Sequence, residues 1–112
     1  MTKKGRVKAR KGAMQPVLIC SVSMGMFSSE LGISLQLADG TSVVAFVDHR
    51  DVLIQGHSPR PGEQVEGVVR VSVVGENQDG VLIDLPQPSI AQGTRIVVTP
   101  AQLKQANIEA FA

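Results

Sequence analysis

The stretch ISLQLADGTSVVAFV, residues 33–47, decides the fold. In its first part Ile33, Leu35 and Leu37 alternate with polar residues, which is the period of a strand that buries one face. An Asp-Gly pair at positions 39 and 40 then separates this strand from a valine-rich run. Such a pair between two strands is a strong hairpin signal, because both central residues tolerate positive φ. The stretch therefore predicts an antiparallel β-hairpin.

Similar short apolar runs on either side of the hairpin predict more strands. Prolines and glycines punctuate these runs, and Pro59 and Pro61 make residues 57–62 a linker that no central strand can contain. Pro86 and Pro88 are expected to end the strand before them. The further strands are expected at residues 17–22, 65–73, 81–85 and 95–98.

The C-terminal residues change to a helical period. Thr99 is a good N-cap, Pro100 fits the first helical position, and Gln102 stands three residues after Thr99, as in a capping box. The following apolar residues would share one helical face: Leu103, Ala106, Ala110 and Phe111. The pattern predicts an α-helix over about residues 100–110, packed on the barrel or sheet.

The two halves of the chain follow the same order. In each, a strand (ending at residues 20–22 or 71–73) leads by a loop to a second strand, a Gly-Thr pair, a valine-rich strand and a capped turn. If this parallel is an internal duplication, two β-β-β-turn halves close into a barrel with pseudo-twofold symmetry, which also removes exposed sheet edges. The predicted fold class is all-β: a small six-stranded barrel with a C-terminal α-helix. An open barrel or a β-sandwich is the alternative.

Alternation also predicts the core. The residues on the inward faces of the expected strands should be buried, and a structure that exposes them would contradict the assigned register. They are Ile33, Leu35, Leu37, Val69, Val71, Val73, Val81, Ile83 and Ile96.

Length and composition fit one globular β domain over residues 14–112. The chain has 112 residues, 43% of them hydrophobic and 19% charged, with valine at 16 positions. No apolar run approaches the ~18 residues of a membrane span, and no signal peptide is expected. The single cysteine, Cys20, excludes an internal disulfide and favours a reducing, cytoplasmic location.

The net charge of +1 conceals an uneven distribution. Residues 1–12 hold six basic side chains and no acid, whereas the rest of the chain holds five basic side chains and all ten acids. Residues 1–13 are therefore expected to form a flexible basic arm that binds polyanions, its own domain or another copy. The candidate polyanion-binding residues are Lys3, Lys4, Arg6, Lys8, Arg10 and Lys11.

No catalytic residue, metal site or cofactor is expected. The cluster Asp48-His49-Arg50-Asp51 looks reactive, but it is explained as a capped turn with His49 and Arg50 facing water. Cys20 lies inside an apolar strand, where a thiol usually behaves as a small hydrophobe rather than as a nucleophile. These residues favour a protein that is not an enzyme.

The most informative segment is residues 23–31, which has the composition of a loop yet carries three large apolar residues. Met24, Met26 and Phe27 form a candidate interaction patch, with Ser28, Ser29 and Glu30 as its polar rim. In the alternative interpretation, this loop folds over one open end of the barrel and completes its core. The predicted function is a non-enzymatic binding or assembly module acting through protein–protein contacts, whose partner is a second copy in a homodimer or an unidentified protein. The alternative is nucleic-acid binding through the basic arm.

Overall fold

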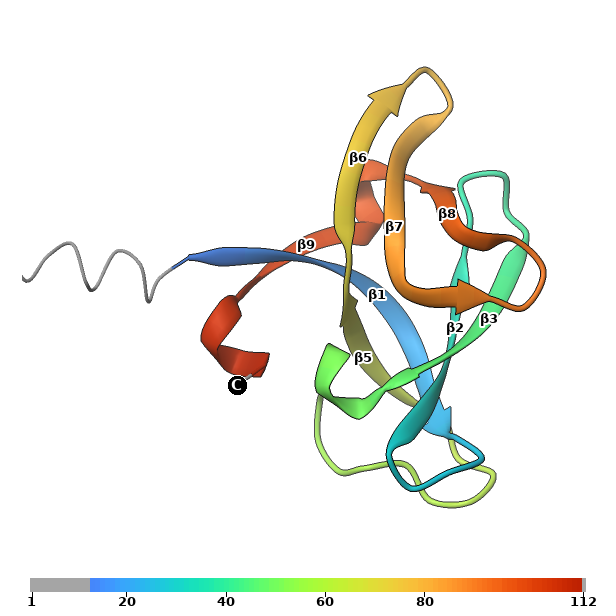
Figure 1. Ribbon diagram of the computed structural model, residues 1–112, viewed down its shortest axis with the longest axis vertical. Helices are drawn as coiled ribbons and strands as arrows, with labels where there is room; N and C mark the ends of the chain where they lie inside the picture. The colour runs from blue at the N-terminus through green and yellow to red at the C-terminus, as the bar shows by residue number, and fades with distance from the viewer. Residues whose placement is uncertain (1–12, 112) are drawn as a thin grey trace, which may run out of the picture.

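The computed structural model describes residues 13–111 and shows an all-β protein (Figure 1). Its strands are all antiparallel, and three short 3-10 turns, labelled η, join some of them. The strands are β1 (Met14–Met24), β2 (Glu30–Gln36), β3 (Ser42–Asp48), β4 (Val52–Ile54), β5 (Val65–Arg70), β6 (Ser72–Asn77), β7 (Gly80–Ser89), β8 (Gly93–Val98) and β9 (Leu103–Asn107). The turns are η1 (His49–Asp51), η2 (Pro100–Gln102) and η3 (Ile108–Phe111).

The strands form one sheet that is not closed, so the expected six-stranded barrel is wrong. The sheet runs in the order β4-β5-β1-β2-β3-β7-β6, with β8 paired to β7 and β9 paired to β1. The ladder between β3 and β7 consists of the single pair Ala45–Ser89. On this side of the sheet, the β2–β3 hairpin is joined to the β7–β8 hairpin by isolated hydrogen bonds, such as that from the Ala38 amide to the Val97 carbonyl at 2.9 Å. These bridges are too short to continue the ladders around a barrel.

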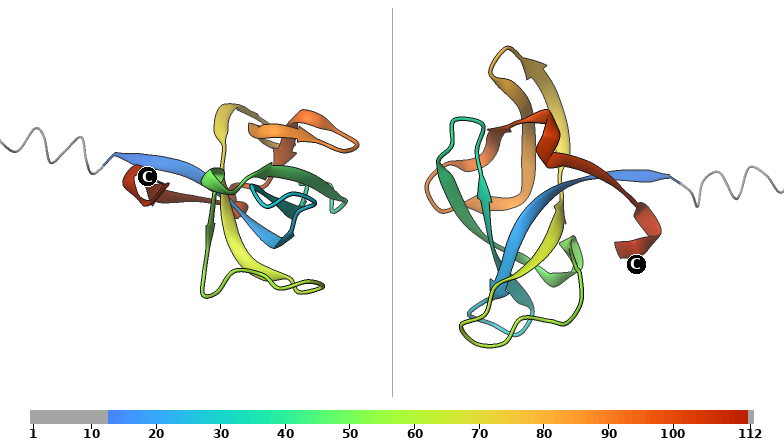
Figure 2. Two further views of the ribbon diagram at one scale, coloured as in Figure 1. Left: turned by 60° about the horizontal axis from the view of Figure 1, so that its bottom comes forward. Right: turned by 180° about the vertical axis from the view of Figure 1, so that it is seen from behind.

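Strand β1 is the centre of the sheet. Strand β5 occupies one of its edges, pairing with residues 17–22. The other edge is shared by two strands in succession, β9 beside residues 14–18 and β2 beside residues 21–24. Figure 2 shows β9 and the first part of β1 running together toward the chain ends. This arrangement places the β1–β2 loop at the opposite end of β1 from Met14 and its pairing with β9.

The predicted β2–β3 hairpin is confirmed, although its turn differs from the expected one. Only Gly40 has a positive φ, of 90°, and Asp39 does not. The Leu37 amide donates to the Thr41 carbonyl at 2.7 Å, which encloses a three-residue loop. The Asp39 carboxylate also accepts hydrogen bonds from the amide and the hydroxyl of Thr41. An extra residue in the loop lets a single glycine supply the left-handed conformation.

The order of elements repeats along the chain. The first half consists of three strands, a 3-10 turn and a short strand: β1, β2, β3, η1 and β4. The second half has the same order, with β5 and β6 together in the place of β1, followed by β7, β8, η2 and β9. The closing strand of each half pairs with the opening strand of the other, β4 with β5 and β9 with β1. The internal duplication itself stays a hypothesis.

The predicted C-terminal helix is wrong. The capping arrangement forms, because the Gln102 Oε1 accepts hydrogen bonds from the Thr99 amide and hydroxyl at 2.8 and 3.0 Å. The turn stops after three residues, however, and Leu103–Asn107 becomes β9. The exposed edge of β1 beyond β2 supplies a ladder for these residues, and this tertiary pairing outweighs the local helical pattern.

The strand expected at residues 81–85 is also longer than predicted, since β7 continues through Pro86 and Pro88 to Ser89. Its ladder with β6 covers residues 80–84, and its ladder with β8 covers residues 81–84 and resumes only at Ser89. No neighbouring strand requires an amide donor from residues 85–88, so the prolines cause no loss of pairing.

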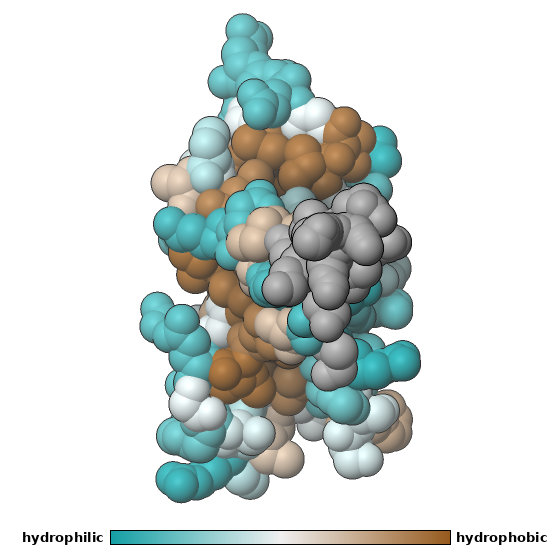
Figure 3. Space-filling model, turned by 90° about the vertical axis from the view of Figure 1, so that its left-hand side faces the viewer, coloured by the Kyte–Doolittle hydropathy of each residue, from teal (hydrophilic) through white to brown (hydrophobic). Residues whose placement is uncertain are grey.

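The hydrophobic core lies between the two halves and confirms the predicted inward faces, with one exception. Eight of the nine predicted core residues are buried, but Val73 is 47% exposed. It lies on β6, which pairs only with β7 and carries a bulge between Val73 and Gly75. The pairing of this segment with β1 ends near Val71. Beyond this point, the side chains on the face that is buried in β5 are exposed to solvent in β6. Figure 3 shows apolar surface at the level of β6.

No helix within residues 13–111 is long and apolar enough to cross a membrane. The prediction of a flexible basic arm falls on residues 1–12, which lie outside the described residues.

Candidate functional site

The candidate interaction patch lies on the loop between β1 and β2, at the lower end of the molecule in Figure 1. The side chains of Met24, Met26 and Phe27 are 50%, 79% and 70% exposed. Ser28 and Ser29 are exposed beside them, and Glu30 is half-buried. The loop therefore presents its apolar side chains outward and does not cover the core.

Backbone contacts hold the tip of this loop and the end that enters β2. The Glu30 amide donates a hydrogen bond to the Phe27 carbonyl at 3.1 Å, which closes a turn at the tip. The His49 amide donates to the Ser29 carbonyl, also at 3.1 Å, and ties the loop to the end of β3. Beyond this point Glu30 pairs with Asp48 in the β2–β3 ladder. The apolar tip of the loop, Met26 and Phe27, is therefore held in place by backbone hydrogen bonds.

Gly25 is required where the loop leaves β1. A Cβ atom at this position would lie 2.6 Å from the Glu30 carbonyl oxygen and 2.5 Å from its Cγ. The absence of a side chain allows the two strands to approach each other directly below the tip. Around this point the loop encloses a shallow hollow of about 290 Å³, lined by Met24, Gly25, Met26, Phe27, Ser28, Glu30 and Leu31.

Two further aromatic residues lie outside the hydrophobic core. Phe46 lies on the outer face of β3 and is half-exposed. Its ring passes over Gly32, with which it is directly paired. The run VVAFV contains no polar residue to mark its outer face, so the sequence holds no signal for this orientation. Phe111, expected on a helix, lies instead in η3, with the Arg70 guanidinium 5.4 Å from its ring centre.

The polar cluster at residues 48–51 acts as the predicted cap. The Asp48 Oδ1 accepts a hydrogen bond from the Arg50 amide at 2.8 Å and forms an ion pair with its guanidinium at 3.1 Å. These hydrogen bonds from Arg50 hold the pKa of Asp48 below its usual value. Asp51 forms an ion pair with Arg70 at 3.2 Å. Both carboxylates are therefore engaged by arginines within the fold.

Cys20 is buried in the core. Burial raises the pKa of its thiol to about 12, so the thiol is protonated at neutral pH. The thiolate is the nucleophilic form of cysteine, and this form is strongly disfavoured here.

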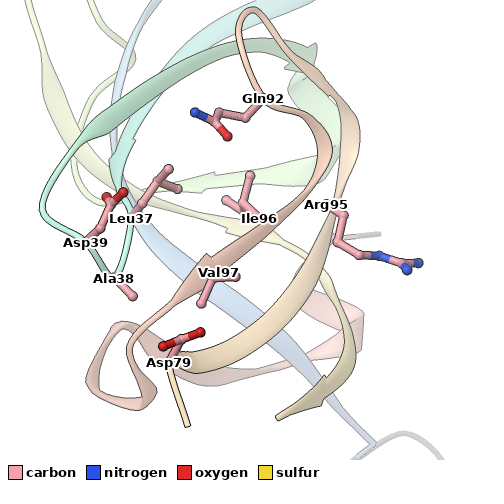
Figure 4. A pocket seen from close by; sticks show the side chains of 8 residues that line it. All are labelled: Leu37, Ala38, Asp39, Asp79, Gln92, Arg95, Ile96 and Val97. Carbon is pink, nitrogen blue, oxygen red and sulfur yellow. The ribbon is translucent and has the colours of Figure 1, made fainter. Parts of the chain in front are cut away.

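A second hollow, of about 440 Å³, lies between the β2–β3 turn and β8 (Figure 4). Leu37 and Ile96 form its apolar floor, and Asp39 and Asp79 stand at its edge. Arg95 points away from the hollow in Figure 4 and forms an ion pair with Asp84 at 3.0 Å. The carboxylate of Asp39 is occupied by Thr41. Asp39 and Arg95, two of the polar groups at this hollow, thus serve a turn and an ion pair of the fold.

The remaining predictions concern the arm and metals. The candidate polyanion-binding residues, Lys3 to Lys11, lie outside the described residues. Among residues 13–111, no three His, Cys, Asp or Glu side chains gather in a way that would hold a metal ion.

Comparison with known proteins found no match to a family model, to a curated protein or to a solved structure.

Proposed function

We propose that this protein is a non-enzymatic binding or assembly module that acts through protein–protein contacts, and that the β1–β2 loop is its contact surface. A second copy of the chain is the proposed partner, so the module forms a homodimer. The observation that supports this proposal is the exposure of Met24, Met26 and Phe27 on a loop whose backbone is fixed by hydrogen bonds. A cytoplasmic location is proposed as well, supported by the single, buried and unpaired cysteine.

The repeated order of elements allows the β1–β2 loop to be compared with its counterpart in the second half, and the comparison supports a role in binding for its apolar residues. The turn between β6 and β7 takes the place of the β1–β2 loop in the second half, and it is polar. There the Asn77 Oδ1 accepts hydrogen bonds from the amides of Asp79 and Gly80 at 2.8 and 3.2 Å. A β-β connection at this place in the fold therefore forms with polar residues alone. Met26 and Phe27 are not needed to build it.

The size of the patch suits a protein contact. Each Met or Phe side chain that becomes fully buried contributes about 1.5–3 kcal/mol, before the entropic cost of association. Methionine adapts its shape to partner surfaces, and a contact that removes three such side chains from water supplies a useful part of the binding free energy. The polar rim of Ser28, Ser29 and Glu30 keeps the free protein hydrated at the edge of the patch.

Sedimentation equilibrium of the full chain tests the proposal. The double variant Met26→Ser, Phe27→Ser should weaken self-association by at least about tenfold, because 1.4 kcal/mol corresponds to a factor of ten. Ile90→Ser is the matched control, since Ile90 is also 70% exposed but lies on the β7–β8 loop. It should leave the association constant unchanged. A monomeric wild type at high concentration, or equal effects of the two variants, would contradict the proposal.

The basic residues at positions 3–11 support one alternative, nucleic-acid binding by the N-terminal segment. Six cations give affinity that falls steeply with salt. A gel shift at increasing salt, comparing the wild type with a variant in which all six are changed to Gln, measures this contribution. Retention of nucleic acid by the wild type alone would favour the alternative, and no retention by either protein would favour the assembly module.

A further inference from the structure

A second apolar surface lies on the outer face of the sheet, opposite to the core. It is a groove of about 410 Å³ over β1, between β5 and β9. Its apolar lining is contributed by three strands, with polar side chains along both walls. Its lining includes Val17, Ile19, Val68, Ala106, Glu66 and Lys104.

The register of the ladders creates this groove. Ile19 is paired with Val68, and Val17 is paired with Lys104 on the other side, so these side chains project from the same face. Val17 is buried at the floor, whereas Ile19 is 40% exposed. Val68 and Ala106 are partly exposed beside Ile19. The groove is therefore an apolar floor open to a partner.

The charges at the groove and at the loop are complementary. Lys104 stands on the β9 wall, and Glu30 stands beside the apolar tip of the loop. Neither has an ion-pair partner within the described residues, where the ion pairs use Asp48, Asp51, Glu63 and Asp84. Glu66 on the opposite wall would repel Glu30 and so favours one orientation of an incoming loop.

We propose that the β1–β2 loop of one copy inserts Met26 and Phe27 into the outer groove of a second copy, with Glu30 of the first copy paired to Lys104 of the second. This inference rests on the proposed function and names the surface that receives the loop. The loop cannot enter the groove of its own chain. Ile19 and Met24 are five residues apart on one extended strand, about 17 Å, and the strand holds the two surfaces apart.

A loop-to-groove contact joins two different surfaces. Each copy still has one loop and one groove, so the contact closes into a dimer only if both loops are exchanged. A contact between two loops around a twofold axis would leave both grooves empty. This difference makes the two arrangements separable by experiment.

Charge reversal provides the first test. Glu30→Lys and Lys104→Glu should each weaken self-association about tenfold, and the double reversal should restore it to within about twofold of the wild type. Arg60→Glu is the matched control, because Arg60 also has no ion-pair partner among the described residues but lies in the linker before β5. It should have no effect. Additive losses in the double variant would overturn the inference.

The unmodified protein provides a second test that does not depend on any variant folding. A zero-length carbodiimide reagent joins a carboxylate to an amine only when the two are in contact. Peptide mapping of the cross-linked dimer should identify a bond between Glu30 and Lys104 of different copies. A dimer without this bond, cross-linked at other pairs, would overturn the inference.

Mixing two defective variants separates this inference from the proposed function. The loop variant Met26→Ser, Phe27→Ser and the groove variant Ile19→Ser, Lys104→Glu should each be monomeric, and their mixture should form one-to-one dimers through the one intact loop and groove. If the wild type is a dimer lost in the loop variant but the mixture stays monomeric, the inference fails and the proposed function stands. A monomeric wild type overturns both.

Discussion

Gly25 and Glu30 face each other across the base of the β1–β2 loop, so closely that a Cβ atom on Gly25 would lie 2.6 Å from the Glu30 carbonyl oxygen. This approach brings the ends of the loop together and lets the Glu30 amide reach the Phe27 carbonyl. The outward position of Phe27 therefore depends on a glycine two residues before it.

Gly25→Ala should destabilise the protein and disturb the loop. The methyl group collides with backbone, which cannot move aside as a flexible side chain can, and overpacking of this kind costs about 1–3 kcal/mol. Urea unfolding gives the change in the free energy of unfolding. Gly75→Ala is the control, because a Cβ at Gly75 meets nothing within 4 Å and its φ is not positive. Equal stability of the two variants would contradict the tight approach.

Ile83→Ala should be among the most damaging single changes in the core. Ile83 is fully buried, and removing its outer atoms leaves a cavity that costs about 2–5 kcal/mol. Val73→Ala, on the open face of β6, should cost less than about 1 kcal/mol. Thermal and chemical unfolding of both variants measure the difference. A large loss at Val73 would show that β6 is covered in solution, for example by another copy.

Cys20 should make the protein less stable at alkaline pH. Burial raises the pKa of the folded thiol from 9.0 to about 12, so the folded state favours the neutral form. Above pH 9 the unfolded thiol ionises while the folded one does not, and the free energy of unfolding falls as pH rises toward 12.

Between pH 8 and pH 10 this loss should be about 1 kcal/mol, and it should be missing in Cys20→Ala. Urea unfolding of the two proteins at both pH values measures it. Native Cys20 should also react with a thiol reagent only as fast as the protein opens. Rapid reaction of the native protein at neutral pH would contradict the burial.

Asp84 should titrate at a lower pH than an ordinary aspartate. Hydrogen bonds from Arg95, at 3.0 and 3.2 Å, lower the pKa of the Asp84 carboxyl. Its contribution to stability is therefore present above the ordinary aspartate pKa of 3.8 and is lost as pH falls through the lower, folded value.

Carboxyl NMR titration measures this pKa directly. Arg95→Gln should raise the pKa of Asp84 toward 3.8 and leave Asp48 unaffected, whereas Arg50→Gln should raise the pKa of Asp48 and leave Asp84 unaffected. The reciprocal pair separates a specific hydrogen bond from a general change in net charge. An unchanged Asp84 in the Arg95 variant would exclude the pairing.

The sequence by itself determined the β2–β3 hairpin, most of the buried faces and the apolar composition of the β1–β2 loop. Each of these depends on residues that are close together in the chain. Alternation at Ile33, Leu35 and Leu37 fixes which side of a strand is apolar, and Gly40 supplies the left-handed residue of the turn. The sequence likewise showed that Met26 and Phe27 lie in a loop.

Only the tertiary structure decided which strands found partners and which faces stayed open. Residues 103–107 have a helical pattern, but the unpaired edge of β1 offered them a ladder, and they became β9. Val73 continues the alternation of β5, yet the chain leaves β1 at Val71 and exposes it. The outer groove over Ile19 arises from three strands that are distant in sequence. Pairing between remote segments is a property of the whole sheet, and local patterns do not contain it.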